Sequence, residues 1–257
     1  SVMGIQACPM PTAVLTSQTG FKSFYCNDCT DKLDYYTSEW KKLGFQPDGI
    51  YTGFLSSEKQ VDKILDFINS FETENTLVLV DPVMGDGGRT YSLFTDALAC
   101  KMKKLVTVAD VITPNLTECC ILCDVDYCKF IKNADKPDFL DKIAELGKNL
   151  LNRYGVKIVI ITGIEHKDID GTMYVQNLIA SKDEVFSVSC KKIGGSYSGT
   201  GDLFASVMFS GLLRGDTLRD TVSLAVKFIE TSLRDTVALG IDRNEGIEFE
   251  KHLKILL

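Results

Sequence analysis

Residues 193–204 read IGGSYSGTGDLF, and this stretch joins a strand-like segment to a helix-like one. Before it, residues 184–188 alternate between polar and apolar side chains, which is typical of a β-strand. After it, apolar residues recur at helical spacing from Leu203 to Leu212. The glycines are therefore expected at the junction between a loop and the start of a helix.

Such a junction suits an anion such as phosphate, because the first N–H groups of a helix are unpaired and its dipole is positive there. Gly199 and Gly201 lack a Cβ atom, so a ligand can approach their backbone closely. Asp202 falls in the first helical turn, where a carboxylate beside phosphate could accept a proton from an attacking hydroxyl. The alternative is an ordinary Gly-rich turn in which Asp202 only favours the start of the helix.

The composition limits the partners of the chain. It has 257 residues, a net charge of −7 and no block of basic residues, which argues against nucleic acid or an anionic membrane as a main partner. Apolar runs such as Ile158 to Ile161 are too short to span a bilayer. The nine cysteines form no disulfide framework and no leader sequence is visible, so a cytoplasmic location is expected. Cys26 and Cys29 have metal-ligand spacing, but with only two histidines in the chain a structural zinc is not favoured.

Strands and helices alternate along the sequence. Thr76–Val80 and Val156–Ile161 are continuous apolar strands, as expected for a parallel sheet buried on both faces. Pro9 and Pro11 mark an irregular or edge strand at 6–15. Further strands are predicted at 48–54, 110–112, 172–178 and 184–189, and helices at 31–43, 94–105, 140–154, 203–213, 218–237 and 248–256, with another helix capped by Ser56. The alternation predicts a three-layer α/β fold with a central, mostly parallel sheet, in a single domain spanning residues 1–257.

Polar residues follow the central strands, at the sheet edge where ligands bind in such folds. They are Asp81, then Asn115 with Glu118, then Thr162. The carboxylates are hard oxygen ligands suited to Mg²⁺, which in turn suits a nucleotide polyphosphate. Taken singly, Asp81-Pro82 is an ordinary turn, and Asn115 with Glu118 is an ordinary capping box. Their joint placement with the Gly-rich loop favours phosphate chemistry.

Six stretches resemble the ribokinase-like superfamily and, within it, the pyridoxal (pyridoxine, pyridoxamine) kinases. They are GIQACPMPTAVLTSQTGF (4–21), GIYTGFLSS (49–57), VDPVMGDGGRTY (80–91), ADVITPNLTE (109–118), ITG (161–163) and GTGDLFASV (199–207). The third and the last are the specific ones, whereas TPNxxE is shared with related vitamin-precursor kinases. The resemblance covers nearly the whole chain and implies a ribokinase-like fold without a separate lid domain.

The resemblance also implies an activity, namely transfer of the ATP γ-phosphate to the 5′-hydroxymethyl group of a B6 vitamer. Asp202 would be the general base, and the amides of Gly199, Thr200 and Gly201 would form the anion hole. The remaining implied roles are Mg²⁺ binding at Asp81 and Glu118, phosphate contacts at Asn115 and Thr162, an ATP-covering loop at 86–91, and substrate contacts at Thr19 and Phe54. Family members often use a monovalent cation such as K⁺ and are commonly homodimers.

Some positions depart from the family pattern. The family begins with a strand and a Gly-rich turn upstream of the match to Ser1, so we expect the chain as given to be incomplete at its start. Gln18 replaces a common His, one Gly is missing before Phe21, and Phe54 replaces a common Tyr. These changes fall in the stretches to which the resemblance assigns vitamer contacts, whereas the stretches implied to bind ATP match the family pattern.

Two alternatives remain beside a B6 kinase. A hydroxymethylpyrimidine kinase acts on a similar ring, but that branch usually has Cys at the position of Asp202 and lacks the GDGG loop. A protein that binds B6 vitamers without turnover is the other, although such a protein gains nothing from a carboxylate beside phosphate.

Overall fold

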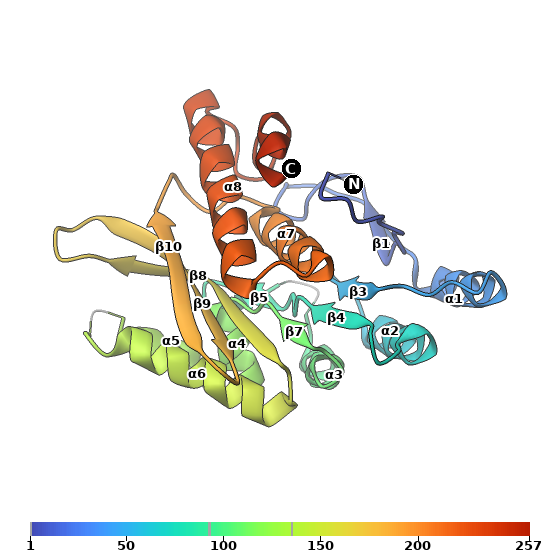
Figure 1. Ribbon diagram of the computed structural model, residues 1–257. Coiled ribbons are helices and arrows are strands. Elements are labelled where there is room, and N and C mark those ends of the chain that lie inside the picture. The colour runs from blue at the N-terminus through green and yellow to red at the C-terminus, as the bar shows by residue number, and fades with distance from the viewer. Residues whose placement is uncertain (1, 92–93, 135) are drawn as a thin grey trace.

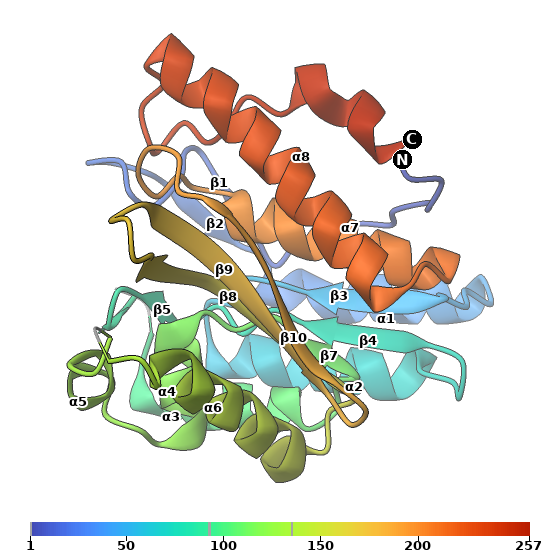
Figure 2. The ribbon, with the colours of Figure 1, turned by 60° about the vertical axis from the view of Figure 1, so that its left-hand side comes forward.

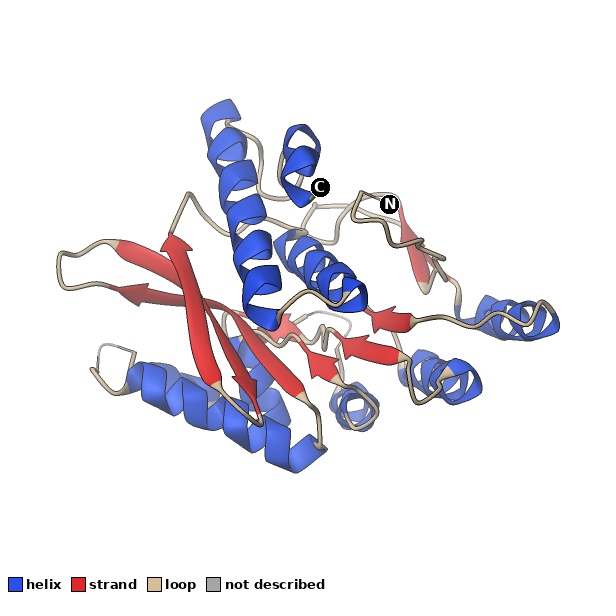
Figure 3. Cartoon of the chain, viewed as in Figure 1, coloured by secondary structure: helices blue, strands red, loops and turns tan. Residues whose placement is uncertain are grey.

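The computed structural model describes residues 2–91, 94–134 and 136–257. In these ranges one sheet has the strand order β10-β9-β8-β7-β4-β3. Neighbours from β3 to β8 are parallel, whereas β9 is antiparallel to both β8 and β10, as Figure 3 shows. The strands are β3 (Gly49–Thr52), β4 (Leu77–Val80), β7 (Val111–Ile112), β8 (Ile158–Lys167), β9 (Met173–Ser181) and β10 (Val185–Lys191). The prediction of a mostly parallel central sheet is confirmed.

Helices cover both faces of this sheet (Figure 1). On one face lie α2 (Glu58–Phe71), α3 (Asp96–Val106), α4 (Leu116–Cys123) and α6 (Phe139–Tyr154), and on the other lie α7 (Thr200–Arg214) and α8 (Leu218–Leu239). The other elements are η1 (Thr30–Lys32), α1 (Leu33–Lys42), α5 (Tyr127–Ile131), η2 (Glu250–Leu256) and the short strands β1 (Ala13–Leu15), β2 (Cys26–Asp28), β5 (Gly85–Asp86) and β6 (Arg89–Thr90). The predicted three-layer α/β architecture is therefore present.

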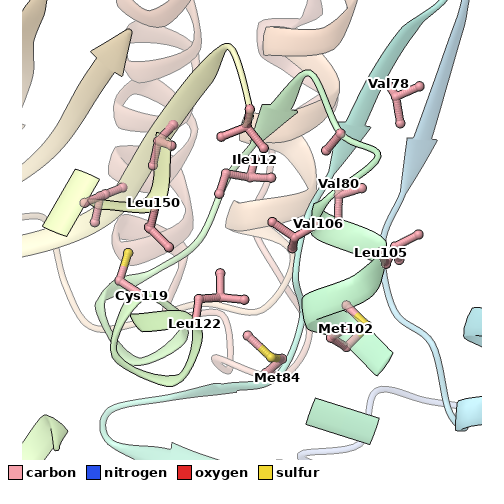
Figure 4. Close-up of a cluster of buried hydrophobic side chains, with 14 of the residues drawn as sticks. Val78, Val80, Met84, Met102, Leu105, Val106, Ile112, Cys119, Leu122 and Leu150 are labelled. Atoms are coloured by element: carbon pink, nitrogen blue, oxygen red, sulfur yellow. The ribbon is translucent and has the colours of Figure 1, made fainter. Parts of the chain in front are cut away.

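The apolar strands are continuous because both faces of the sheet are covered. In β4, Val78 and Val80 point to the layer of α3 and α4, while Leu79 points to the layer of α7 and α8, and all three are fully buried. Figure 4 shows Val78 and Val80 among the apolar side chains of the first layer. Burial of each such side chain contributes about 1.5–3 kcal/mol, so this double-sided core holds the central strands in place between the helix layers.

The prediction of an irregular or edge strand at residues 6–15 is confirmed in part. Of residues 6–15, Ala13–Leu15 form a strand, and it pairs with β2 in a separate two-stranded sheet. Pro9 and Pro11 have no N–H group to donate to a neighbouring strand, which explains why the preceding residues are irregular.

The predicted cap of α2 was wrong by one residue. Ser57 accepts the N–H of Gln60 at 3.3 Å, whereas Ser56 donates its hydroxyl to Asp28 at 2.6 Å. The last helix is a 3₁₀ helix, and α7 begins earlier than predicted, at Thr200.

In the parts of the chain described above, no helix is both long and apolar enough to cross a membrane.

A glycine allows α7 and α8 to pack closely. A Cβ atom at Gly211 would lie 2.5 Å from Cγ2 and 2.7 Å from Oγ1 of Thr221, whose side chain is buried. We predict that Gly211→Ala lowers the free energy of unfolding by about 1–3 kcal/mol, because a short branched side chain cannot move away from the added methyl group. Chemical denaturation measures this change.

The control is the double variant Gly211→Ala with Thr221→Ala, in which the two closest contacts are removed and the Cβ atom of residue 221 remains at 3.2 Å. Its loss of stability should be smaller than the sum of the two single losses. A Gly211→Ala protein as stable as the parent would contradict the close packing of α7 on α8.

Candidate active site

The Gly-rich loop ends where α7 begins, as the sequence predicts. Gly199 is the N-cap of α7 and has φ 81°, a left-handed conformation that favours glycine. The Thr200 hydroxyl donates to the carbonyl of Tyr197 at 3.0 Å and thereby braces the turn. Asp202 lies in the first turn of α7. The loop therefore presents backbone N–H groups beside a carboxylate.

Asp81 follows β4 directly and is held by the neighbouring strand. Its N–H donates to the carbonyl of Thr52 at 2.9 Å, and its side chain is buried. Burial and the negative charge of Asp202 raise the pKa of Asp81 to about 7. The Thr113 hydroxyl acts in the opposite direction but does not cancel this rise. A carboxyl group that titrates so high in a cleft is typical of functional sites.

Glu118 and Asn115 form the capping box that the sequence allows. The Glu118 carboxylate accepts the N–H of Met84 at 3.0 Å and the N–H of Asn115 at 2.8 Å. Asn115 donates its side-chain amide to the carbonyl of Gly85 at 2.7 Å. Burial and the charge of Asp81 still raise the pKa of Glu118 well above its usual range. The box thus ties the start of α4 to the loop after β4.

Thr162 is placed differently from the prediction, because β8 does not end there. The strand continues to Lys167, with an irregular register between Ile161 and Ile164 where Gly163 has φ 69°. The N–H of Thr162 donates to the carbonyl of Pro114 at 2.9 Å, next to Asn115. The irregularity therefore brings Thr162 to the edge of the sheet that carries the other polar residues.

One cleft, with a volume of about 1310 Å³, is lined by every site residue that the sequence predicts. These residues are Thr19, Phe54, Asp81, Asn115, Glu118, Thr162, Gly199, Thr200, Gly201 and Asp202. The loop with Thr19 is shaped in part by Gln18, whose side-chain oxygen accepts the N–H of Gly20 at 2.5 Å. Residues from both ends of the sequence thus meet at one edge of the sheet.

The cleft also contains residues that the sequence did not single out. They are chiefly Thr113 and Tyr127 near the acids, Val226, Ile229 and Leu233 on one face of α8, and Arg243 after α8, while Tyr91 belongs to the predicted loop at 86–91. The apolar face of α8 could have been found from its helical periodicity, but nothing in the sequence showed that it faces a ligand cleft. Tyr91 stays protonated, since partial desolvation and nearby carboxylates raise its pKa to about 12, although its side chain is partly exposed.

The acids of the cleft fit a bound cation. Asp81, Glu118 and Asp202 form no ion pair with any residue that the structure describes, and burial raises the pKa of each. Asp202 keeps surface open to the cleft, but the surrounding walls reduce its solvation. The same ranges contain no group of three or more His, Cys, Asp or Glu residues arranged to hold a metal. Two carboxylates with added phosphate and water oxygens are, however, the usual set for Mg²⁺.

A three-layer α/β fold with an anion loop and buried acids at the carboxyl edge of its sheet defines a class of small-molecule kinase. Residues 6–246 match the family described as phosphomethylpyrimidine kinase, and the chain belongs to that family. The kinship with pyridoxal kinases that the sequence motifs indicate is confirmed by curated relatives and solved structures.

A Schizosaccharomyces pombe protein provisionally named a pyridoxal kinase is 30% identical over 207 residues, which are 78% of this chain and 57% of that protein. A Bacteroides thetaiotaomicron protein, provisionally named a phosphomethylpyrimidine kinase, has a crystal structure with TM-score 0.90 and 37% identity, covering 99% of this chain and 85% of that one. An orthorhombic form of that protein was crystallised with pyridoxal. The pyridoxal kinase of Lactobacillus plantarum shares the fold, with TM-score 0.85, 24% identity and coverage of 100% and 87%.

The raised pKa of Asp81 predicts how stability depends on pH in the absence of divalent cations. The pKa is about 7 in the folded state against an ordinary value of 3.8, so the unfolded chain releases this proton first as pH rises. Stability contributed by this group therefore falls between about pH 4 and pH 7. We predict that Asp81→Asn, which cannot ionise, stabilises the protein more at pH 8 than at pH 5, by roughly 2 kcal/mol.

Denaturation with a chelator present, at both pH values, measures this difference. The exposed residue Asp66, changed to Asn, is the control and should show no comparable pH dependence. An equal effect of Asp81→Asn at pH 5 and pH 8 would mean that Asp81 is ionised in the folded protein throughout this range.

Proposed function

We propose that this protein transfers the γ-phosphoryl group of ATP to the 5′-hydroxymethyl group of a B6 vitamer. The observation that carries the proposal is the position of Asp202. It follows the Gly199–Gly201 amides at the start of α7 and lines the same cleft as Asp81 and Glu118. A base, an anion-binding backbone and a pair of acids for a metal are the parts that phosphoryl transfer to an alcohol requires.

In this proposal Asp202 removes the proton from the substrate hydroxyl as its oxygen attacks the γ-phosphorus. The cleft walls raise the pKa of Asp202, which makes the carboxylate a stronger base than an ordinary aspartate. The N–H groups of Gly199, Thr200 and Gly201 stabilise the charge that develops on the transferred group, with the positive end of α7 behind them. Asn115 and Thr162 contact the phosphates of ATP.

Asp81 and Glu118 are proposed to hold Mg²⁺ directly or through its waters. Bound there, the ion would neutralise the negative charge of the phosphates and act as the counter-ion of these acids. The two carboxylates differ in their backbone hydrogen bonds. That of Glu118 accepts two backbone N–H groups, whereas that of Asp81 accepts no backbone N–H group in the described part of the chain. Asp81 is therefore the better direct ligand, and Glu118 is suited to orient waters.

A B6 vitamer is favoured as the acceptor by the relatives and by Asp202. The Bacteroides relative was crystallised with pyridoxal, and the S. pombe relative is named as a pyridoxal kinase. Thr19, next to Gln18, and Phe54 both line the cleft, and in this proposal they contact the ring. The second candidate is a hydroxymethylpyrimidine kinase, which the family description favours. The presence of Asp202 rather than Cys argues against that candidate and against a binding protein without turnover.

Replacement of Asp202 tests the general base. We predict that Asp202→Asn binds ATP nearly as well as the parent protein but lowers kcat with pyridoxal by roughly 10²–10⁴-fold, because an amide cannot accept the proton. ADP formation and ATP binding are measured side by side. Asp220→Asn is a matched control, since Asp220 also lies in the first turn of a helix but outside the cleft. Unchanged turnover in Asp202→Asn would remove Asp202 as the base.

Replacement of Glu118 tests the metal assignment. We predict that Glu118→Gln shifts the Mg²⁺ dependence of the rate to higher concentration, because one ligand charge is lost. In this variant the new side-chain NH₂ group faces one of the two backbone N–H donors, so one hydrogen bond is lost to a contact between two donors. This loss costs about 1–3 kcal/mol of stability. Thermal denaturation is therefore recorded with the kinetics. An unchanged Mg²⁺ dependence in a folded variant would exclude Glu118 from the metal site.

A further inference from the structure

The charged side chains that line the cleft are unevenly distributed. The acids are Asp81, Asp86, Glu118, Glu165, Asp202 and Glu230, and the bases are Lys191, Lys192 and Arg243. A substrate that carries phosphate must find its positive partners among these few bases and a metal ion. A base that is free to bind phosphate would therefore help to determine which substrates the cleft accepts.

The two lysines differ in their partners. Lys192 forms an ion pair with Glu165 at 2.6 Å, whereas Lys191 forms no ion pair with any residue that the structure describes. Both lysines lie at or just after the end of β10. Among the described residues the Arg243 side chain likewise has no hydrogen bond and no ion pair, and its planar guanidinium group, unlike the ammonium group of Lys191, can pair with two phosphate oxygens at once. Its guanidinium group is therefore available to a ligand in the cleft.

The backbone of Arg243 lies between the anion loop and the loop containing Thr19. Its carbonyl oxygen accepts the N–H of Ser198, the residue before Gly199, at 3.0 Å. The neighbouring Asn244 reaches the other loop, since a Cβ atom built at Gly20 would be 2.4 Å from its Oδ1 atom. Figures 1 and 2 both show the N-terminal region, in blue, close to the segment that follows α8, in red. Arg243 thus lines the cleft where the loop containing Thr19 and the Gly-rich loop before α7 meet.

The segment around Arg243 is held firmly by local hydrogen bonds. The N–H of Asn244 donates to the Asp242 side chain at 2.9 Å, and the N–H of Glu245 donates to the Asp242 carbonyl at 3.0 Å. Further along, the N–H of Glu248 donates to the Thr236 hydroxyl at 2.9 Å. These contacts use the backbone and other side chains, so the exposed Arg243 side chain can be changed without removing them.

We propose that Arg243 binds the phosphoryl group after its transfer to the acceptor, and so recognises the phosphate monoester product. The proposal rests on the kinase function proposed above and extends it to a specificity-determining residue. A guanidinium group matches two phosphate oxygens with paired, charge-assisted hydrogen bonds. Because negative charge moves toward the acceptor during transfer, a cation at this junction favours the product and the transition state over the neutral acceptor.

The test compares binding of pyridoxine 5′-phosphate with binding of pyridoxine, which avoids aldehyde reactions with lysine. In the parent protein the phosphorylated form should bind more tightly. In Arg243→Gln its affinity should fall about tenfold or more, while the affinity for pyridoxine changes less than about twofold. Arg243→Lys should retain part of the affinity, because one positive charge remains. Arg153→Gln removes the same charge from the surface outside the cleft and should change neither affinity.

Kinetics provide an independent measurement of the same role. In Arg243→Gln we expect kcat to fall while the KM for ATP changes little, and inhibition by the phosphorylated product to weaken. An unchanged affinity for pyridoxine 5′-phosphate, or equal losses for both ligands, would overturn the proposal. A higher KM for ATP with unchanged product affinity would also overturn it, because Arg243 would then contact ATP.

The binding experiment separates this proposal from the proposed function. If the parent protein binds pyridoxine 5′-phosphate through Arg243 but does not form it from ATP, the kinase function fails and the phosphate site stands. If the parent protein forms the product and Arg243→Gln binds it equally well, the kinase function stands and the role of Arg243 fails.

Discussion

Negative charge without a protein counter-ion dominates the cleft. Asp81 is buried beside Asp202 and Glu118, and none of the three forms an ion pair in the described part of the chain. Keeping charged carboxylates out of water is unfavourable unless an opposite charge is supplied. The fold tolerates this cost because the double-sided apolar core fixes the strand that ends at Asp81. The unpaired acids therefore support the cation and the phosphates that we propose for this cleft.

Backbone groups define the other half of the cleft. The start of α7 offers unpaired N–H groups to an anion, and Gly199 permits the left-handed turn that exposes them. Backbone N–H groups also orient an acid of the cleft, since the amides of Met84 and Asn115 donate hydrogen bonds to the Glu118 carboxylate. Positive backbone dipoles and acidic side chains therefore lie in one cleft, an arrangement that suits a metal-bound polyphosphate better than either partner alone.

Much of the architecture could be predicted from the sequence because its signals are local. Apolar strands such as Leu77–Val80, the capping box of Asn115 and the Gly-rich start of α7 each depend on neighbours in sequence. Interactions between distant segments could not be predicted. The pairing of Ala13–Leu15 with β2 and the extension of β8 beyond Thr162 depend on which strands are adjacent in space. Arg243 was missed for the same reason, since its link to Ser198 joins two loops separated by the whole of α7 and α8.

The most direct measurement is the release of ADP from Mg²⁺-ATP with pyridoxal, pyridoxine, pyridoxamine or hydroxymethylpyrimidine as the acceptor. Mass spectrometry of the product identifies the phosphorylated molecule. We expect turnover with at least one B6 vitamer, with the phosphate on its 5′-oxygen, and much slower turnover with the pyrimidine. Turnover with the pyrimidine alone would contradict the assigned acceptor. Measurable ATP binding without turnover of any of these acceptors would contradict the assigned reaction.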